Sequence, residues 1–416
     1  MASLQPVRGT HDVLSGESRN FRYIFEIGRK SAEDYGYDEV ATPIFEFTEV
    51  FSRTLGETSD IVTKEMYTFI DKGGDSITLR PEGTAGIARS LISSGQNQNL
   101  PLKYFYSGPM FRYERPQKGR LRQFHQVGVE LLGVAEPMGD VEVISLGAAF
   151  LDRLGVQKST RLEINTLGNI SSRLAYRAIL LEYFRDHRAL LSSESKERLE
   201  KNPLRILDSK SKEDQEIVAK APSFDASLDA ESQDFFSRVC TGLDTLNIDW
   251  NRNIRLVRGL DYYCHTTFEF TTNLLGAQST VLAGGRYDGL VEQMGGPATP
   301  GIGWASGVER LSMLVEGVPK KRRPIAVVPL GERAEEKSLV LTEKLRREGF
   351  SVDVGYRGKV KQRMKRANNI NACAAVIIGE EELAQGAATV RDLDSGEQKL
   401  VSFENLQQYI QEFYFT

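Results

Sequence analysis

Cysteine and histidine are scarce in this sequence. Its 416 residues include three cysteines, Cys240, Cys264 and Cys373, and four histidines. The cysteines are far apart and form no CxxC pair, so we expect neither a disulfide framework nor a Cys/His zinc site. No signal-peptide core opens the chain, and no run approaches the roughly 18 apolar residues of a membrane span. The sequence therefore predicts a cytoplasmic protein with no membrane segment.

A strong charge bias is also absent. The chain has 53 Lys and Arg against 57 Asp and Glu, a net charge of −4 and a pI of about 5.8. This balance excludes a protein that coats nucleic acid indiscriminately and leaves room only for local basic surfaces. The GxxxxGK motif followed by Ser or Thr is missing, so any use of ATP has to proceed without a P-loop. The length predicts two or three globular domains.

Residues 103–133 are the most informative stretch. Two runs rich in aromatic and β-branched residues flank a polar, cationic middle, which predicts an antiparallel hairpin with a long loop. Between Arg112 and Arg122 five cations oppose Glu114 alone, and this local charge of +4 suits an anionic ligand. An ordinary hairpin with a solvated, charged tip is the alternative.

The returning strand of the hairpin carries a second pattern. Side chains at every other position share one face of a strand. That face would display a ring, an amide, a gap and a carboxylate, from Phe124, Gln126, Gly128 and Glu130. Glycine weakens a strand interior, so Gly128 favours the close approach of another group to the sheet.

Two more stretches carry candidate ligand-binding residues. In residues 80–92, RPEGTAGIARSLI, a predicted strand changes into a helix at Glu82, Gly83 and Thr84. A carboxylate at this position can bind the ammonium group of a ligand. The alternative is that it only complements the helix dipole. Residues 255–270, RLVRGLDYYCHTTFEF, predict strand, tight turn and strand. The turn holds an arginine that can clamp a phosphate and two phenols that can hydrogen-bond a polar ligand: Arg258, Tyr262 and Tyr263. A Tyr-rich turn packed on the core is the alternative.

The remaining pattern outlines the domain organisation. We expect helices over 18–35 and 141–154, strands over 39–44, 65–70, 76–79 and 161–165, and a helical insertion over about 170–240 with a mobile middle near 210–224. Residues 283–296 predict strand, Gly-Gly turn and helix, and residues 301–317 predict a strand that runs into a helix with Glu309 and Arg310. A basic linker, 319–324, precedes a regular α/β pattern over 325–416. Within it, six cations and no acid over 357–366 favour contact with a phosphate backbone, a solvated face being the alternative.

Several motifs together resemble one enzyme family. Residues 111–130, FRYERPQKGRLRQFHQVGVE, resemble motif 2 of class II aminoacyl-tRNA synthetases, and GIGWASGVERL at 301–311 resembles motif 3. The region around Pro43 is similar to motif 1, the dimer-forming element. RGLDYY, AGGRYDGL and LRPEGTAG are similar to the histidine-specific signatures and the amino-acid-binding turn of the histidyl-tRNA synthetase family. The resemblance extends from about Arg8 to the end of the chain.

This resemblance implies a fold and a reaction. The fold is α+β: a class II antiparallel sheet flanked by helices in a catalytic domain, 1–318, with the helical insertion, followed by the linker and an α/β anticodon-binding domain, 325–416. The reaction joins histidine and ATP into histidyl-adenylate and pyrophosphate, and then transfers histidine to the terminal adenosine of histidine tRNA. Mg²⁺ is expected to bind mainly through the ATP phosphates, with no metal site of the protein's own. A homodimer is expected as well.

The resemblance also assigns roles to residues. Those implied to bind histidine are Glu82, Gly83, Thr84 and Gln126 at its ammonium end, Glu130, Tyr262 and Tyr263 at its imidazole, and Arg258. Those implied to bind ATP are Phe124 and Arg310 on either side of adenine, Arg112 at the α-phosphate, and Arg115 and Arg120 at the outer phosphates. Arg112 and Arg258 are the implied catalytic residues. Candidates for tRNA contact are Gln117, Arg357, Lys359, Lys361, Arg363 and Lys365.

Two alternatives and one departure accompany this interpretation. A catalytically inactive, histidine-sensing regulatory subunit of ATP phosphoribosyltransferase shares the scaffold, but its relatives usually lack the carboxy-terminal domain. A ligase that activates an amino acid without tRNA is the other alternative. Cys264 and His265 depart from the family pattern, and we expect Cys264 to react with thiol reagents and His265 to face solvent.

Overall fold

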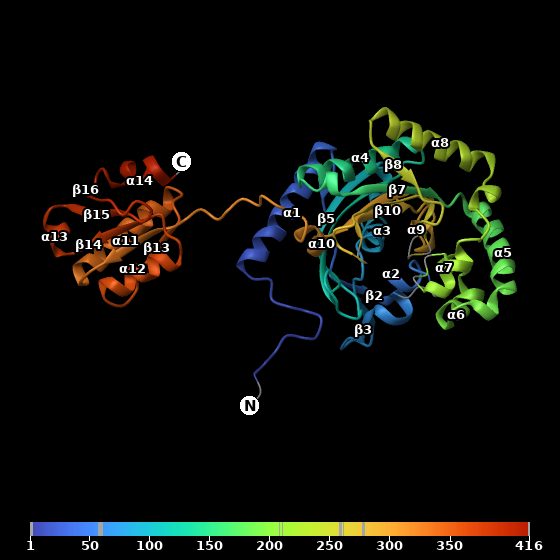
Figure 1. Cartoon of the computed structure of the whole chain (residues 1–416), viewed down its shortest axis with the longest axis horizontal. Helices are drawn as coiled ribbons and strands as arrows, with labels where there is room; N and C mark the ends of the chain where they lie inside the picture. The colour runs from blue at the N-terminus through green and yellow to red at the C-terminus, as the bar shows by residue number, and fades with distance from the viewer. Residues whose placement is uncertain are drawn as a thin grey trace. The chain divides into compact units, whose positions relative to one another are not determined.

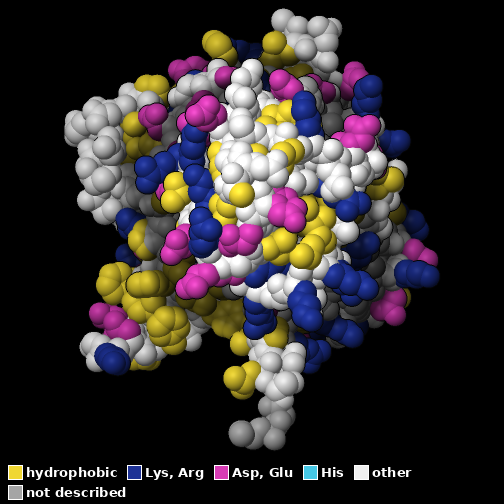
Figure 2. Space-filling model, turned by 90° about the vertical axis from the view of Figure 1, so that its left-hand side faces the viewer, with side chains coloured by type: hydrophobic (Ala, Val, Ile, Leu, Met, Phe, Trp, Pro, Cys, Tyr) yellow, Lys and Arg dark blue, Asp and Glu magenta, His cyan; other side chains and the backbone are white. Residues whose placement is uncertain are grey.

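The computed structural model describes residues 3–56, 61–207, 209, 211–257, 260, 262–276 and 279–414 (Figure 1). These residues divide into two compact units, Met1–Val318 and Pro319–Thr416. None of the helices described is both long and apolar enough to cross a membrane. On the face drawn in Figure 2, acidic and basic side chains are interspersed. This mixture agrees with the prediction that basic surfaces are only local.

The described part of the first unit is built on an eight-stranded sheet. Its strand order is β1-β5-β6-β11-β10-β9-β7-β8. The strands span Asp38–Glu39, Leu102–Phe111, Gln123–Leu132, Gly301–Gly307, Thr280–Arg286, Cys264–Thr271, Arg161–Thr166 and Trp250–Arg252, in that order. Central neighbours are antiparallel, whereas β1 runs parallel to β5 and β8 parallel to β7. The predicted class of fold is therefore confirmed.

The predicted hairpin is the pair β5 and β6. The two strands pair over ten residues, from Leu102 opposite Leu132 to Phe111 opposite Gln123. Alternation along β6 sends Val127, Val129 and Leu131 into the core beneath the helices α1 (Ser15–Asp34), α4 (Pro137–Arg153) and α10 (Val308–Ser312). The residues between them face the other side of the sheet, where α3 (Thr84–Ser93) and α9 (Leu290–Gln293) pack. The shared face predicted from period-two spacing is thus confirmed.

A strand predicted over 39–44 is wrong. The segment splits between β1 in the large sheet and β2 (Phe45–Phe47) in a small one, with Pro43 in the connection. Proline lacks the N–H that a ladder needs, so the chain leaves the first sheet before reaching it. The small sheet described has the order β2-β4-β3, with β4 over Ser76–Leu79 and β3 over Tyr67–Ile70, and α2 (Thr48–Ser52) follows β2.

The helical insertion lies between β7 and β8. It comprises α5 (Ile170–Asp186), α6 (Ser193–Lys201), α7 (Lys212–Val218) and α8 (Ala230–Thr245), with a core of its own around Leu180, Phe184 and Ile206. The described residues of the middle near 210–224, which the sequence predicts to be mobile, include α7. Asp214 anchors this helix, because its carboxylate accepts hydrogen bonds from the backbone N–H of Ser192 and from the hydroxyl of Ser195.

Two further predictions are wrong: the Gly-Gly turn within residues 283–296, and the strand at the start of residues 255–270. Gly284 and Gly285 lie inside β10. A Cβ at Gly284 would lie 2.1 Å from the carbonyl oxygen of Gly303, and one at Gly285 would lie 2.8 Å from the ring of Tyr263. These glycines therefore permit close packing and do not turn the chain. The strand that precedes RGLDYY is β8, and it already ends at Arg252. The tight turn predicted within RGLDYY includes Gly259, which falls outside the described residues.

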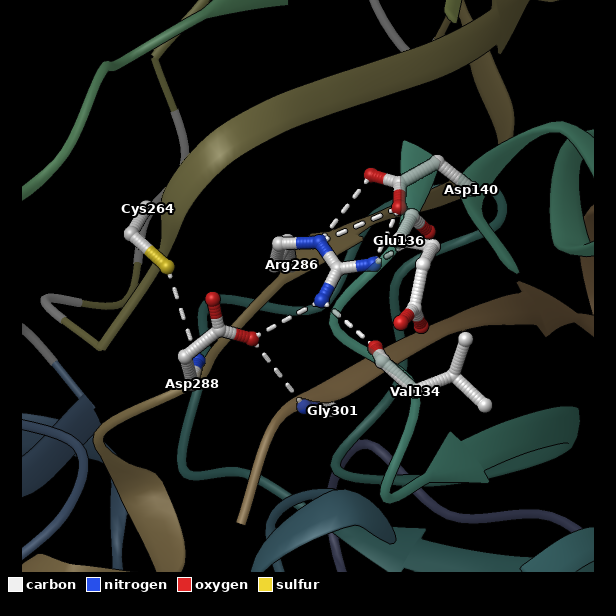
Figure 3. Close-up of polar contacts among 7 residues, drawn as sticks. All are labelled: Val134, Glu136, Asp140, Cys264, Arg286, Asp288 and Gly301. Atoms are coloured by element: carbon white, nitrogen blue, oxygen red, sulfur yellow. Dashed lines mark hydrogen bonds and ion pairs between the residues drawn. The ribbon is translucent and has the colours of Figure 1, made fainter. Parts of the chain in front are cut away.

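Arg286 and Asp140 form an ion pair in the interior of the first unit (Figure 3). Both side chains are fully buried. The Arg286 guanidinium donates to Asp140 Oδ2 (3.0 Å from Nε), to the Val134 carbonyl (2.9 Å) and to Asp288 Oδ1 (3.0 Å). This network joins β10 to the first turn of α4 and to the Asp288 loop.

Replacing Arg286 by methionine is expected to lower the free energy of unfolding by about 3–5 kcal/mol, because the Asp140 carboxylate would be left buried without its cation. Urea unfolding measures the change. The double variant Arg286→Met, Asp140→Leu is the control, since it removes both charges and should be less destabilised than the single variant. Equal destabilisation of the two variants would contradict this account.

The second unit has the alternating pattern predicted from the sequence. Its described sheet has the order β13-β12-β14-β15-β16, with β12 parallel to β13 and β14 and the last two strands antiparallel. The elements are β12 (Ile325–Pro329), α11 (Glu332–Arg347), β13 (Val352–Val354), α12 (Val360–Asn369), β14 (Ala374–Ile378), α13 (Glu380–Ala384), β15 (Ala387–Asp392), β16 (Gln398–Ser402) and α14 (Leu406–Tyr414). The basic segment 357–366 comprises three residues that precede α12 and the first part of that helix.

Candidate active site

A cavity of about 290 Å³ opens on the face of the large sheet that carries α3 and α9. It brings together residues from the hairpin, the turn before α3, the RGLDYY segment and α10. The predicted residues that line it are Glu82, Thr84, Arg112, Arg120, Phe124, Gln126, Tyr262, Tyr263 and Arg310. Arg258 falls outside the described residues, and Arg115 and Gln117 are exposed on the hairpin loop outside the described lining.

One end of the cavity is acidic and enclosed. Glu82 is 5% exposed, and its carboxylate accepts the backbone N–H groups of Thr84 (2.7 Å) and Ala85 (2.9 Å) at the start of α3. Burial nevertheless raises the pKa of Glu82. Gly83 is needed here because a Cβ would lie 2.3 Å from the ring of Tyr106. Beside this turn, the buried Oε1 atom of Gln126 has no hydrogen-bond partner among the described residues.

Glu130 lies behind the acidic end and does not itself line the cavity: Thr84, which does line it, donates to Glu130, and Gly303 leaves room for its side chain. Its side chain is fully buried, and its carboxylate accepts hydrogen bonds from the hydroxyls of Thr84 (2.6 Å) and Tyr287. A Cβ at Gly303 would collide with its Oε2 atom, so the neighbouring strand must carry glycine at that position. Burial raises the pKa of Glu130 to about 8. At neutral pH and without a ligand, this carboxyl group is therefore largely protonated.

The raised pKa of Glu130 makes stability depend on pH. The folded protein holds a proton that the unfolded chain releases above about pH 4.5, so the stability that this proton contributes is complete below pH 4.5 and is lost as the pH rises through about 8. Without histidine, we expect the unfolding free energy of the wild type, relative to Glu130→Gln, to fall by on the order of 4 kcal/mol between about pH 5 and pH 9. Urea titrations across this range check the slope, and a constant difference would contradict it.

Two adjacent tyrosines close the acidic end. Tyr262 and Tyr263 are 4% and 8% exposed, and their ring centroids are 4.5 Å apart. The glycine at 285 leaves room for the ring of Tyr263 against β10. Tyr287, which donates to Glu130, was missed by the sequence analysis. The available signal was its position within the AGGRYDGL motif. The prediction used the glycines of this motif and overlooked the tyrosine between them.

The other end of the cavity is cationic. The Arg112 guanidinium carbon lies 5.2 Å from the centroid of the Phe124 ring, and its Nε donates to the Pro81 carbonyl at 2.9 Å. Arg310 donates to the carbonyls of Gly119 (3.2 Å) and Thr280 (2.8 Å). Burial, and then the nearby Arg120, lower the pKa of Arg310. Cations gathered in this way are suited to bind an anionic ligand.

Two acidic residues that the sequence analysis named without giving them a role support this end. Glu114, the single acid of the loop, forms an ion pair with Arg120. Glu309 accepts hydrogen bonds from the backbone N–H of His125 (2.9 Å) and contacts its Nδ1 atom (2.9 Å). These contacts fix the loop and the Phe124 segment relative to α10.

Cys264 and His265 do not behave as predicted. Cys264 is 7% exposed, and burial raises the pKa of its thiol to about 12, and both properties disfavour the expected reaction with thiol reagents. His265 is half-buried and packs on Phe235, with ring centroids 4.8 Å apart, so it does not simply face solvent. Both residues line a separate cavity toward the insertion.

The basic helix is less uniformly exposed than its sequence suggests. Arg363 is 8% exposed, and its guanidinium donates to the carbonyls of Pro329 and Gly358 and to Glu335. Arg366 forms a bidentate pair with Asp353. The other predicted cations, Arg357, Lys359, Lys361 and Lys365, are exposed.

The antiparallel sheet with its acidic and cationic cavity, followed by an α/β unit, agrees with the class II aminoacyl-tRNA synthetase architecture that the motifs resemble. The family model for histidyl-tRNA synthetase matches residues 9–311, and the model for an anticodon binding domain matches residues 324–413. The chain belongs to the histidyl-tRNA synthetase family.

Relatives agree with this assignment over the full length. A histidine–tRNA ligase of Rhodospirillum rubrum is 58% identical, with 99% of this chain and 100% of the relative covered. Another, of Gluconacetobacter diazotrophicus, is 53% identical, with 99% of each covered. The crystal structure of apo S. aureus histidyl-tRNA synthetase is 35% identical, with a TM-score of 0.82 and coverage of 98% of this chain and 99% of that chain. These similarities do not favour the regulatory-subunit alternative.

Proposed function

We propose that this protein is a histidine–tRNA ligase. In the first step, the carboxylate of histidine attacks the α-phosphorus of ATP, and pyrophosphate leaves as histidyl-adenylate forms. In the second step, a ribose hydroxyl of the terminal adenosine of histidine tRNA attacks the acyl carbon, and AMP leaves. The observation that carries the proposal is one cavity that has Glu82 at one end, with the buried Glu130 behind its lining, and a group of arginines at the other end.

The acidic end has the donors and acceptors that histidine requires. The ammonium group of histidine would lie among Glu82, Thr84 and Gln126. The buried Oε1 atom of Gln126, which has no partner among the described residues, would accept a hydrogen bond from it. Its imidazole would reach Glu130 and Tyr263, with Tyr262 beside them. An amino acid without ring nitrogens could not form these hydrogen bonds, so it would bury its side chain against polar groups without compensation, which gives strong discrimination.

The cationic end has the groups that ATP requires. Adenine would lie between Phe124 and Arg310, with the α-phosphate on Arg112 and the outer phosphates toward Arg120 and the exposed Arg115. Arg258 would approach the α-phosphate from the opposite side, an assignment that rests on the motif alone. Mg²⁺ would enter mainly on the ATP phosphates, and Glu269 and Glu309 line the same cavity with carboxylate oxygens that suit it. The protein catalyses by positioning and by stabilising charge, without a nucleophile of its own.

We assign tRNA contact to Arg357 and Lys359, just before α12, to Lys361 and Lys365 within it, and to Gln117 on the hairpin loop. Arg363 is left out of this surface because it is buried and already satisfied. The exposed cations can neutralise backbone phosphates, so binding of tRNA should weaken steeply with salt. The cytoplasm, where tRNA charging takes place, is the expected compartment.

We also propose that the small sheet is covered by a second copy of the chain. Phe45, Phe47 and Phe69 share one face of this sheet and are 55%, 58% and 48% exposed. Exposed aromatic groups on neighbouring strands are typical of an interface. Light scattering should give about twice the 46.5 kDa of one chain.

ATP–pyrophosphate exchange with each of the twenty amino acids, without tRNA, tests the proposed function. Exchange with histidine alone is expected, followed by charging of histidine tRNA. Histidine binding without exchange would overturn the proposal in favour of a histidine sensor. Exchange without transfer to tRNA would favour the ligase that needs no tRNA.

A further inference from the structure

The helical insertion reaches the histidine pocket through one arginine. Arg173 lies in the first turns of α5, and its Nη1 atom donates a hydrogen bond of 2.6 Å to the backbone carbonyl of Tyr263. Arg173 is therefore a residue of the insertion that contacts the segment bearing the proposed imidazole ligand. Its side chain lines the separate cavity behind Tyr262 and does not line the active-site cavity.

The start of α5 is a fixed anchor for this arginine. Asn169 caps α5 by accepting the backbone N–H of Ser172 (2.9 Å), and its amide donates to Asp229 (2.6 Å). Asp229 in turn caps α8 by accepting the backbone N–H of Ser232 (2.8 Å). The amino termini of the two helices are therefore tied to each other. Arg173, one turn beyond the cap, has little freedom to move relative to this junction.

The segment that Arg173 contacts leaves the regular sheet. Strand β9 begins at Cys264, so Tyr263 lies just outside it, and His265 has a φ of 43°, in the left-handed region. The insertion and this segment are also joined through the backbone, because Leu167 donates to the His265 carbonyl (2.7 Å) and His265 donates to the Gly168 carbonyl (2.8 Å). The Arg173 contact extends this junction to Tyr263 itself.

We propose that Arg173 is a positioning residue for the histidine site. By holding the Tyr263 carbonyl, it sets the direction of the Tyr263 phenol toward the imidazole end of the cavity. The insertion thereby contributes to the affinity for histidine although none of its described residues lines that cavity. This inference rests on the proposed function only for the identity of the ligand.

Arg173→Gln and Arg173→Lys in the full-length protein test the proposal. Calorimetry measures the histidine Kd, and ATP–pyrophosphate exchange measures the KM values for histidine and ATP. For Arg173→Gln we expect the histidine Kd and KM to rise about tenfold, with the KM for ATP within about twofold of wild type. Arg173→Lys keeps one donor and should recover part of the affinity.

Arg177→Gln is the matched control. Arg177 lies one turn further along α5 and donates to the carbonyls of Glu200 (3.1 Å) and Lys201 (3.4 Å), both inside the insertion. It should leave both KM values unchanged. An unchanged histidine Kd in Arg173→Gln would overturn the proposal. So would a result in which the KM values for histidine and ATP rise equally, and to the same extent in Arg173→Gln and Arg177→Gln. Calorimetry measures histidine binding without requiring catalysis. If the wild-type protein binds histidine but shows no exchange, the proposed function is refuted, and the histidine Kd of Arg173→Gln still tests the role of Arg173.

Discussion

Replacing Glu130 by glutamine is expected to lower kcat/KM for histidine in ATP–pyrophosphate exchange by about 10²-fold, with the KM for ATP nearly unchanged. The carboxyl group is fully buried, accepts from Thr84 and Tyr287, and lies directly behind the lining of the acidic end, where the proposed function requires it to meet an imidazole N–H. A glutamine retains the size, but unlike Glu130 it cannot lose a proton when histidine binds, so it cannot form a charge-assisted hydrogen bond to the imidazole.

Steady-state exchange with varied histidine and saturating ATP measures this loss. Glu142→Gln is the matched control, since Glu142 lies on α4, pairs with Lys103 (2.7 Å) and is outside the cavity lining. It should leave kcat/KM for histidine unchanged. A fall of less than about threefold in Glu130→Gln would contradict the assignment of Glu130 to the imidazole.

Replacing Arg112 by glutamine is expected to lower kcat for exchange by about 10²–10³-fold, with the histidine Kd within a few-fold of wild type. Arg112 is held over Phe124 and by the Pro81 carbonyl, so its charge is positioned before ATP arrives. Charge that develops on the α-phosphate in the displacement would lose this preorganised cation. Glutamine can still donate to Pro81, which separates the loss of charge from loss of the local fold.

Lys118→Gln is the control for Arg112, because Lys118 is an exposed cation on the same hairpin loop and does not line the cavity. It should leave kcat unchanged. Calorimetric titration with histidine confirms that the acidic end of Arg112→Gln is intact. A kcat within tenfold of wild type would refute the catalytic role of Arg112.

Much of the active site could be predicted because it depends on local periodicity. Alternation along β6 is a property of any strand, so Phe124, Gln126 and Glu130 had to share a face once the hairpin formed. The buried carboxyl at Glu130 and the close approach at Gly128 agree with that expectation. Residues supplied by other segments were harder to find. Tyr287 reaches Glu130 from 157 positions away, and spacing along the chain carries no sign of this contact.

The errors share a physical cause. Gly284 and Gly285 were interpreted as a turn because glycine usually supplies unusual φ angles, but here both provide space against neighbouring strands. Arg363 was counted with an exposed basic surface, but one face of α12 packs against the sheet and buries that guanidinium with its partners. Cys264 was expected to be reactive because of its neighbours in sequence, yet burial, which is a property of the packed fold, decides its pKa.

The sequence by itself determined the hairpin, the face of β6, the order of the elements and the family, because each follows from local patterns or from motifs in order. The tertiary structure decided which glycines make room, which arginines are buried, what raises the pKa of Glu130 and how Arg173 reaches Tyr263. These properties depend on burial and on contacts between distant segments, and neither exists until the chain has folded.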